Sequence, residues 1–137
     1  MTESVAENKK INLPKIEPTT RVLAMPTDTN AAGDIFGGWI MSQVDIAGSI
    51  AAHRHAGGRT VTVAVNAIQF KKPVYVADLV SFYAEVKKVG NTSMTVFVEV
   101  YAERNRQQHD VVKVTEATLT FVAIDNEGKP QTVKPLD

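Results

Sequence analysis

Residues 28–48 read DTNAAGDIFGGWIMSQVDIAG, a loop followed by the first half of a long apolar helix. The loop is rich in turn formers, and the apolar residues after it predict a helix from about Ile35 to His55, with Asp34 as its cap. Apolar side chains surround most of the helix axis, which is typical of a buried helix. Asp45 nevertheless lies well inside it. Because an unpartnered carboxylate costs several kcal/mol to bury, Asp45 is expected to have a specific role.

The remainder of the chain predicts an antiparallel sheet. Runs with alternating apolar residues, bounded by turn formers, cover residues 19–25, 60–70, 76–89, 92–103 and 110–125. One buried helix and a long antiparallel sheet share a single core if the sheet curls around the helix. We therefore expect an α+β chain with the hot-dog fold, in which a long antiparallel β-sheet wraps around one central α-helix.

Length and composition predict one globular domain. The 137 residues are 44% hydrophobic and 22% charged, which is ordinary for a chain with a real core. We expect a polar N-terminal arm at residues 1–15, the hot-dog domain at 16–130 and a C-terminal tail at 131–137. The N-terminal sequence lacks the apolar core of a signal peptide, and no apolar run approaches the ~18 residues of a membrane span. The expected location is therefore cytoplasmic.

Charge and cysteine content exclude several classes of function. Lys and Arg together number 15, as do Asp and Glu, so no net field favours nucleic acid or a membrane as a partner. The lack of cysteine rules out disulfides, a thiolate nucleophile and Cys-based metal sites. His53 and His55 do not share a helix face, and no third ligand accompanies them at metal-binding spacing. We expect no metal.

Small residues share the helix face of Asp45. At ~100° per residue, that face holds Gly38, Met41, Ser42, Gly48, Ser49 and Ala52. Such a stripe lets another backbone or a ligand approach closely. Two interpretations follow: a packed helix contact in which Asp45 bonds to a local Ser or a backbone amide, or a carboxylate beside a narrow channel that acts on a bound ligand.

Gly37 and Gly38 lie in the first turn of the predicted helix, where backbone N–H groups lack helical acceptors. Without a Cβ to obstruct them, these amides could stabilise an oxyanion, helped by the helix dipole. Asp45 lies seven residues further on, a rise of ~10 Å, whereas a base and an oxyanion donor must both lie within roughly 3–4 Å of the reacting atoms. One helix cannot easily supply both. Two antiparallel copies can, which predicts an active site at a dimer interface.

The helix and the loop before it also carry a resemblance to a known family. The pattern D-x-N-x-x-G-x-x-x-G-G followed by six residues and D resembles the acyl-CoA thioesterases of the hot-dog superfamily, and most closely the bacterial YciA-type acyl-CoA hydrolases. The likeness runs from about residue 21 to residue 130 and includes VTVAVNAIQFKKPV and TFVAIDNEGK. The matching residues of the core pattern are Asp28, Asn30, Gly33, Gly37, Gly38 and Asp45.

This resemblance implies hydrolysis of short- to medium-chain acyl-CoAs, or of a broader range, to free CoA and a carboxylic acid. It implies that Asp45 is the general base or the nucleophile. Asn30 of the opposite subunit would place the water or the thioester, and the amides near Gly37 and Gly38 would polarise the carbonyl. The family forms homodimers that often assemble into trimers of dimers. No cofactor is implied, because CoA is part of the substrate.

CoA carries phosphates, so part of the surface should be basic. Arg59 and Lys71 are candidates, although a cation at a strand end is usually just solvated. The backbone at Thr60 and Val61 begins the strand after the helix, which in such folds can pair with pantetheine. Amides of the turn from Gly90 to Ser93 are a further candidate for contact with CoA.

Other functions stay open at this point. A hot-dog dehydratase usually pairs Asp with His. Here no His lies in a suitable place near Asp45 or near the N-terminal end of the predicted helix. A non-catalytic acyl-CoA sensor would normally carry an output module, for which 137 residues leave no room. A packing role alone does not explain Asn30, the glycine pair and Asp45 together.

Overall fold

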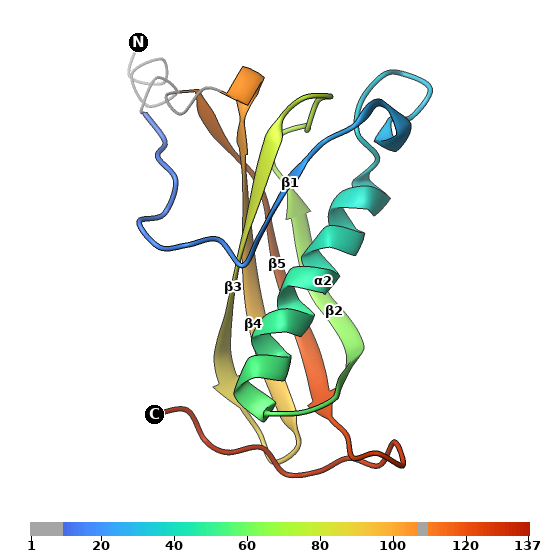
Figure 1. Cartoon of the computed structure of the whole chain (residues 1–137), viewed down its shortest axis with the longest axis vertical. Coiled ribbons are helices and arrows are strands. Elements are labelled where there is room, and N and C mark those ends of the chain that lie inside the picture. Colours follow the sequence, from blue (N-terminus) through green and yellow to red (C-terminus); the bar gives the residue numbers. More distant parts are fainter. Residues whose placement is uncertain (1–9, 107–109) are drawn as a thin grey trace.

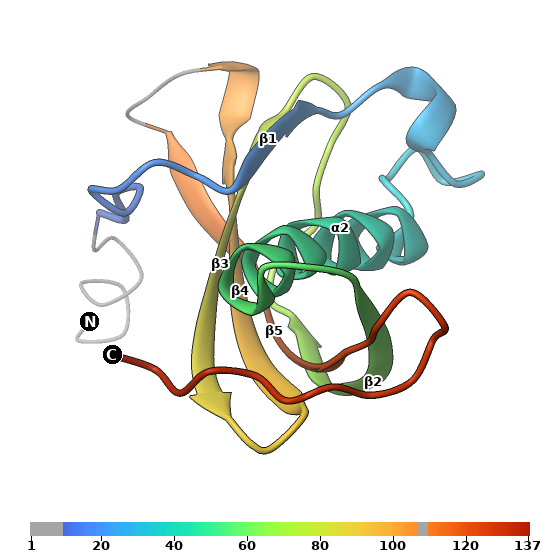
Figure 2. The same ribbon diagram turned by 60° about the horizontal axis from the view of Figure 1, so that its bottom comes forward.

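A five-stranded antiparallel sheet curves around one long helix in the computed structural model, which describes residues 10–106 and 110–137 (Figures 1 and 2). The strand order is β1-β3-β4-β5-β2. The predicted helix wrapped by a long antiparallel sheet is confirmed. The elements are β1 (Thr20–Leu23), η1 (Pro26–Asp28), α2 (Gly37–Ala56), β2 (Thr60–Phe70), β3 (Leu79–Val89), β4 (Ser93–Glu103), η2 (Arg104–Arg106) and β5 (Val111–Ala123). Residues 1–9 of the predicted arm and 107–109 of a polar turn lie outside the described ranges.

The core lies between α2 and the concave face of the sheet. Phe82, Met94, Leu119 and Phe121 are fully buried there. The helix approaches the sheet closely at Gly48, since a Cβ at this position would lie 3.1 Å from the Phe121 ring. The helix can approach the sheet this closely because Gly48 has no side chain.

Only one face of α2 is buried, so the expectation of a helix buried all round is wrong for the single chain. The residues that face the sheet are Ile40, Val44, Ala47, Gly48 and Ala52. On the other side, Met41 is 39% exposed and Ile46 is 45% exposed. The curved sheet covers one side of the helix and leaves an apolar strip open.

The edge strand β2 carries further exposed apolar side chains. It pairs with β5 on one side only, and Val61, Val63 and Val65 are 39%, 55% and 41% exposed. A long edge strand with exposed valines is a template for pairing with another chain unless something covers it. The open strip of α2 and the edge of β2 are joined by a hydrogen bond between Asp45 and Thr62.

The helix begins two residues later than predicted. Its N-cap is Phe36, which makes no side-chain capping bond, so the prediction that Asp34 caps the helix is wrong. Asp34 instead closes the preceding loop, where its backbone oxygen accepts a hydrogen bond from the backbone N–H of Asn30 at 2.7 Å. The predicted stop at Gly57 is confirmed, since Gly57 has a left-handed φ of 73°.

Thr115 offers a test of core energetics. Its side chain is fully buried in β5, and its hydroxyl has no partner within the described ranges. Replacing Thr115 by Val keeps the shape and removes an unsatisfied polar group, so the free energy of unfolding should rise by about 1 kcal/mol. Urea denaturation measures the change, with Thr118→Val on the same strand as control. A lower urea midpoint for Thr115→Val would show that the hydroxyl has a partner in the assembled protein.

Candidate active site

Asp45 is half-buried and is held by a neighbouring strand. Thr62 Oγ1, on β2, donates a hydrogen bond to Asp45 Oδ1 at 2.6 Å. This bond fixes the orientation of the carboxylate and leaves Oδ2 without a protein partner among the residues that the structure describes. Asp45 and Thr62 line a cavity of about 360 Å³ together with Gly38, Met41, Ser42 and Val65. The side chains around the carboxylate are therefore mainly small or apolar.

The first turn of α2, the helix entrance, supplies two unused backbone N–H groups, those of Gly37 and Gly38. Trp39 and Ile40 already donate their N–H groups to the Phe36 carbonyl, at 3.1 and 3.3 Å. The amides of Gly37 and Gly38 have no acceptor within residues 10–106 and 110–137. A Cβ built on Gly38 meets nothing within 4 Å, so the space beside its Cα is open. A carbonyl oxygen placed there would accept a hydrogen bond at the positive end of the helix dipole.

Asn30 is fixed in the loop before the helix. Its Oδ1 accepts hydrogen bonds from the amides of Ala32 and Asp34, at 2.9 and 3.1 Å. The loop turns at Gly33, whose φ of 90° is in the left-handed region that favours glycine. Because both of these bonds engage the side-chain oxygen, the Asn30 side chain can contribute to a site only by donating from its NH₂ group.

Asn30 and Asp45 line different cavities in one chain. The Asn30 cavity, also about 360 Å³, includes Gly37 and Lys71 and contains neither Asp45 nor Thr62. Within the Asp45 cavity, Gly38 and Asp45 are seven residues apart, a rise of ~10 Å. The predicted catalytic residues Asn30, Gly38 and Asp45 therefore do not meet at one point within a single chain.

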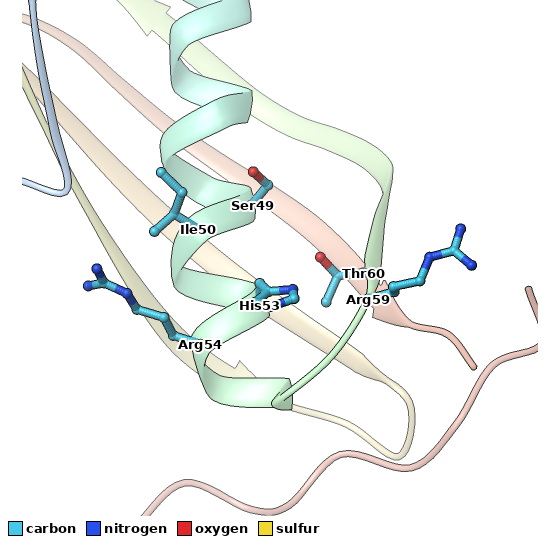
Figure 3. Close-up of a pocket in the computed structure, with 6 residues that line it drawn as sticks. All are labelled: Ser49, Ile50, His53, Arg54, Arg59 and Thr60. Atoms are coloured by element: carbon cyan, nitrogen blue, oxygen red, sulfur yellow. The ribbon is translucent and has the colours of Figure 1, made fainter. Parts of the chain in front are cut away.

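A third cavity, of about 430 Å³, lies at the C-terminal end of α2. It includes the predicted substrate-binding residues Arg59 and Thr60, and His53 faces Thr60 across it (Figure 3). Arg54 and Arg59 extend to opposite sides of this cavity. Lysines and arginines therefore accompany two of the cavities: Lys71 and Lys72 at the helix entrance, and the arginine pair at its end.

The remaining predicted substrate-binding residues lie apart from these groups. Val61 is on the open edge of β2. Gly90 and Ser93 form the turn between β3 and β4, where the Gly90 amide donates to the Ser93 carbonyl at 2.8 Å. Neither of them lines any of the three cavities. In one chain, this turn contacts the C-terminal segment, since Val133 N donates to Asn91 O at 2.9 Å.

Comparison with known proteins identifies the family. The model of the thioesterase superfamily matches residues 32–108. The chain belongs to this superfamily. The acyl-CoA thioester hydrolase YciA of Escherichia coli is 47% identical over 122 residues, which cover 88% of this chain and 92% of that protein. The prediction of a YciA-type acyl-CoA thioester hydrolase is thereby confirmed at the level of the family.

Solved structures agree with this thioesterase in fold. A hexameric thioesterase from Yersinia pestis is 48% identical with a TM-score of 0.83, over 90% of this chain and 100% of that one. A hexameric hotdog-fold thioesterase from Campylobacter jejuni is 45% identical with a TM-score of 0.82, over 87% of this chain and 91% of that one. The predicted hot-dog fold is confirmed.

Thr62 is the site residue that sequence reasoning missed. One of the two interpretations left open above paired Asp45 with a local Ser or a backbone amide, but Ser49 donates instead to the Ile46 carbonyl at 2.7 Å. The partner is a threonine on a strand, 17 positions away. The available signal was the alternation of β2, which places the side chains of Thr60 and Thr62 on one face.

Two general features of this thioesterase bear on its chemistry. Among the described residues, no three His, Asp or Glu side chains are grouped so that they could hold a metal ion. Over the same ranges, no helix is long and apolar enough to cross a membrane. His55 has a structural contact, since its Nε2 hydrogen-bonds the Lys134 carbonyl at 2.8 Å. That the reaction needs neither a metal nor a cofactor stays a prediction.

Proposed function

We propose that this thioesterase hydrolyses acyl-CoAs of short to medium chain length, or of a broader range, to free CoA and a carboxylic acid, with Asp45 as the reactive carboxylate. The observation that carries the proposal is a carboxylate that Thr62 holds in place in a cavity lined mainly by small or apolar residues. The family and the relatives named above support the reaction class. Residence in the cytoplasm and the domain boundaries stay predictions from the sequence.

The chemistry follows from the free Oδ2 of Asp45 and the amides of the helix entrance. As a general base, Oδ2 takes a proton from water while the water oxygen attacks the thioester carbon. As a nucleophile, Oδ2 attacks that carbon itself, and water then hydrolyses the resulting anhydride. In both routes the amides of Gly37 and Gly38 stabilise the oxyanion, the carbon–sulfur bond breaks, and CoA leaves as a thiolate that takes up a proton.

The complete site is proposed to lie between two subunits. In one chain the Gly38 amide and Asp45 are too far apart for one carbonyl, and Asn30 lines another cavity. An antiparallel pair of α2 helices brings Asn30 and the glycine amides of one subunit to Asp45 of the other. The same contact would cover the apolar strip of α2 and Val65 of β2, which lines a cavity with Met41. Three such dimers would form a trimer of dimers, consistent with the relatives described as hexameric.

CoA is proposed to contact residues around the ends of α2. Arg59 and Lys71 would attract its phosphates, and the backbone at Thr60 and Val61 would pair with pantetheine. Gly90 and Ser93 line none of these cavities within one chain. They would contact CoA only from another subunit.

The test of the function is CoA release from acetyl-, butyryl-, hexanoyl- and palmitoyl-CoA, followed with a thiol-reactive dye. The protein contains no cysteine, so the dye reports only the CoA thiol. Release of CoA supports the proposal and ranks the acyl lengths. No release from any of these substrates, combined with tight binding of the same acyl-CoAs, would favour the acyl-CoA sensor instead.

Gly38→Ala should separate catalysis from stability. A methyl group at Gly38 meets no atom within 4 Å in the chain, so the fold should be kept. The methyl group would occupy space beside the Gly38 amide, where the thioester carbonyl is proposed to bind, and we expect kcat/KM to fall by roughly 10²-fold. Gly48→Ala is the matched control, because its methyl group would press on the buried Phe121 ring and lower the melting temperature. Unchanged kcat/KM in Gly38→Ala would place the carbonyl elsewhere.

A further inference from the structure

The loop between β2 and β3 forms one wall of the helix entrance. The Val74 carbonyl accepts a hydrogen bond from the Ile35 amide at 3.1 Å, and both side chains are buried. Pro73 and Val74 line the same cavity as Asn30 and Gly37. Ile35 lies two residues before the first glycine of α2. The position of the unused amides therefore depends on where this loop holds Ile35.

Arg104, the first residue of η2 directly after β4, contacts the loop at three points. One guanidinium nitrogen forms an ion pair with Asp78, and the other donates to the Pro73 carbonyl at 2.8 Å. The guanidinium carbon lies 4.5 Å from the centre of the Tyr75 ring, which is a stacking distance. Asp78 in turn accepts the Tyr75 amide at 2.9 Å. The side chains of Arg104 and Asp78 are only 16% and 3% exposed, so water screens this pair weakly.

The loop needs to be held, because its backbone contains an unfavourable conformation. Ala77 has a φ of 73°, in the left-handed region that costs a non-glycine residue about 1–2 kcal/mol. Its amide donates to the Ala24 carbonyl at 2.9 Å, and the Ala24 amide donates to the Asp78 carbonyl at 3.0 Å. Such a conformation persists only where surrounding contacts enforce it.

We propose that Arg104 is a positioning residue for thioester hydrolysis. Through Pro73, Val74 and the bond to Ile35, it sets the direction of the Gly37 and Gly38 amides, and it touches no reacting group itself. This inference rests on the proposed function, since it presumes that these amides bind the thioester carbonyl.

Arg104→Lys is the decisive variant. Lysine keeps a positive charge for Asp78, but a single ammonium group cannot also hold the Pro73 carbonyl and stack on Tyr75. We expect kcat to fall roughly 10-fold while KM changes less than about 2-fold, since the loss concerns the transition state. Binding gives a second readout. The wild-type protein should bind a ketone analogue, in which a methylene replaces the thioester sulfur, more tightly than an S-alkyl-CoA without a carbonyl. Arg104→Lys should lose much of this preference.

The control is another ion-pair network of the same sheet. Lys113 contacts Glu99 at 2.7 Å and also pairs with Glu116, and its hydrogen bond to Glu116 holds the pKa of that carboxyl below its ordinary value. Lys113→Met should lower stability and leave kcat and the analogue preference unchanged. Tyr75→Leu, which removes only the stacking face, replaces Arg104→Lys if the latter does not fold.

The outcomes are distinct. A lower melting temperature in Arg104→Lys with unchanged kcat and unchanged analogue preference would make Arg104 merely structural and overturn the inference. If the wild-type protein itself shows no preference for the ketone, the proposed role of the helix-entrance amides fails, and the inference fails with it. A wild-type preference that Arg104→Lys retains overturns the inference alone.

Discussion

Asp45→Asn should lower kcat for acyl-CoA hydrolysis by about 10²–10⁴-fold, the usual contribution of a positioned base. An amide neither takes a proton from water at neutral pH nor attacks a thioester. Its oxygen can still accept the hydrogen bond from Thr62, which now reaches Asp45 at 2.6 Å, so the local structure should survive. The measurement is dye-detected CoA release by the variant and the wild-type protein. Circular dichroism and sedimentation serve as controls for fold and assembly.

A fully active Asp45→Asn variant would remove Asp45 from the mechanism. If the variant is inactive as expected, a single turnover of the wild-type protein in water enriched in oxygen-18 distinguishes the two routes. Direct attack transfers label into the Asp45 carboxylate, because the anhydride is opened by labelled water. General-base catalysis puts the label only in the released acid.

Two inactive variants should restore activity when they share a dimer. Asn30→Asp keeps the oxygen that accepts the amides of Ala32 and Asp34 but loses the NH₂ donor, and Asp45→Asn loses the carboxylate. If each site combines Asn30 of one subunit with Asp45 of the other, a mixed dimer holds one intact site. Random pairing of equal amounts then gives about a quarter of the wild-type activity, from the two-fold symmetry of the contact.

The mixing experiment requires co-expression, so that the two variants assemble during folding. Different affinity tags on the two variants allow the mixed species to be isolated, and each variant expressed alone provides the baseline. Activity that stays at this baseline in the mixed species would show that both residues act within one chain. That result would contradict the interface site and leave Asp45 itself untouched.

The sequence predicted the features that repeat along the chain. The alternation of residues 60–70 gave the limits of β2 as the structure has them, and the glycine after the helix gave its end. Asp45 stood out because a carboxylate inside an apolar helix is costly. Each of these signals is local, because it depends on the spacing of neighbouring residues.

The failures concern contacts between distant or competing groups. Asp34 has the right side chain for a helix cap, but the Asn30 loop engages its backbone, and the helix starts at Gly37 instead. Thr62 could not be singled out because its bond to Asp45 crosses from strand to helix. The Arg104 contacts to the loop before β3 join segments 26 and 31 positions apart and leave no spacing pattern.

Because the edge of β2 is open, the resistance of the folded chain to aggregation depends on its assembly. A newly made subunit carries three exposed valines on a strand whose outer edge is unpaired, the kind of surface on which misassembly and fibrous aggregates begin. In the proposed dimer the same contact that completes the site also covers Val65 of this strand. A mutation that loosens the contact would therefore cause two kinds of damage at once, a loss of turnover and a gain in aggregation. Selection for turnover therefore also preserves resistance to aggregation, because both depend on the same contact.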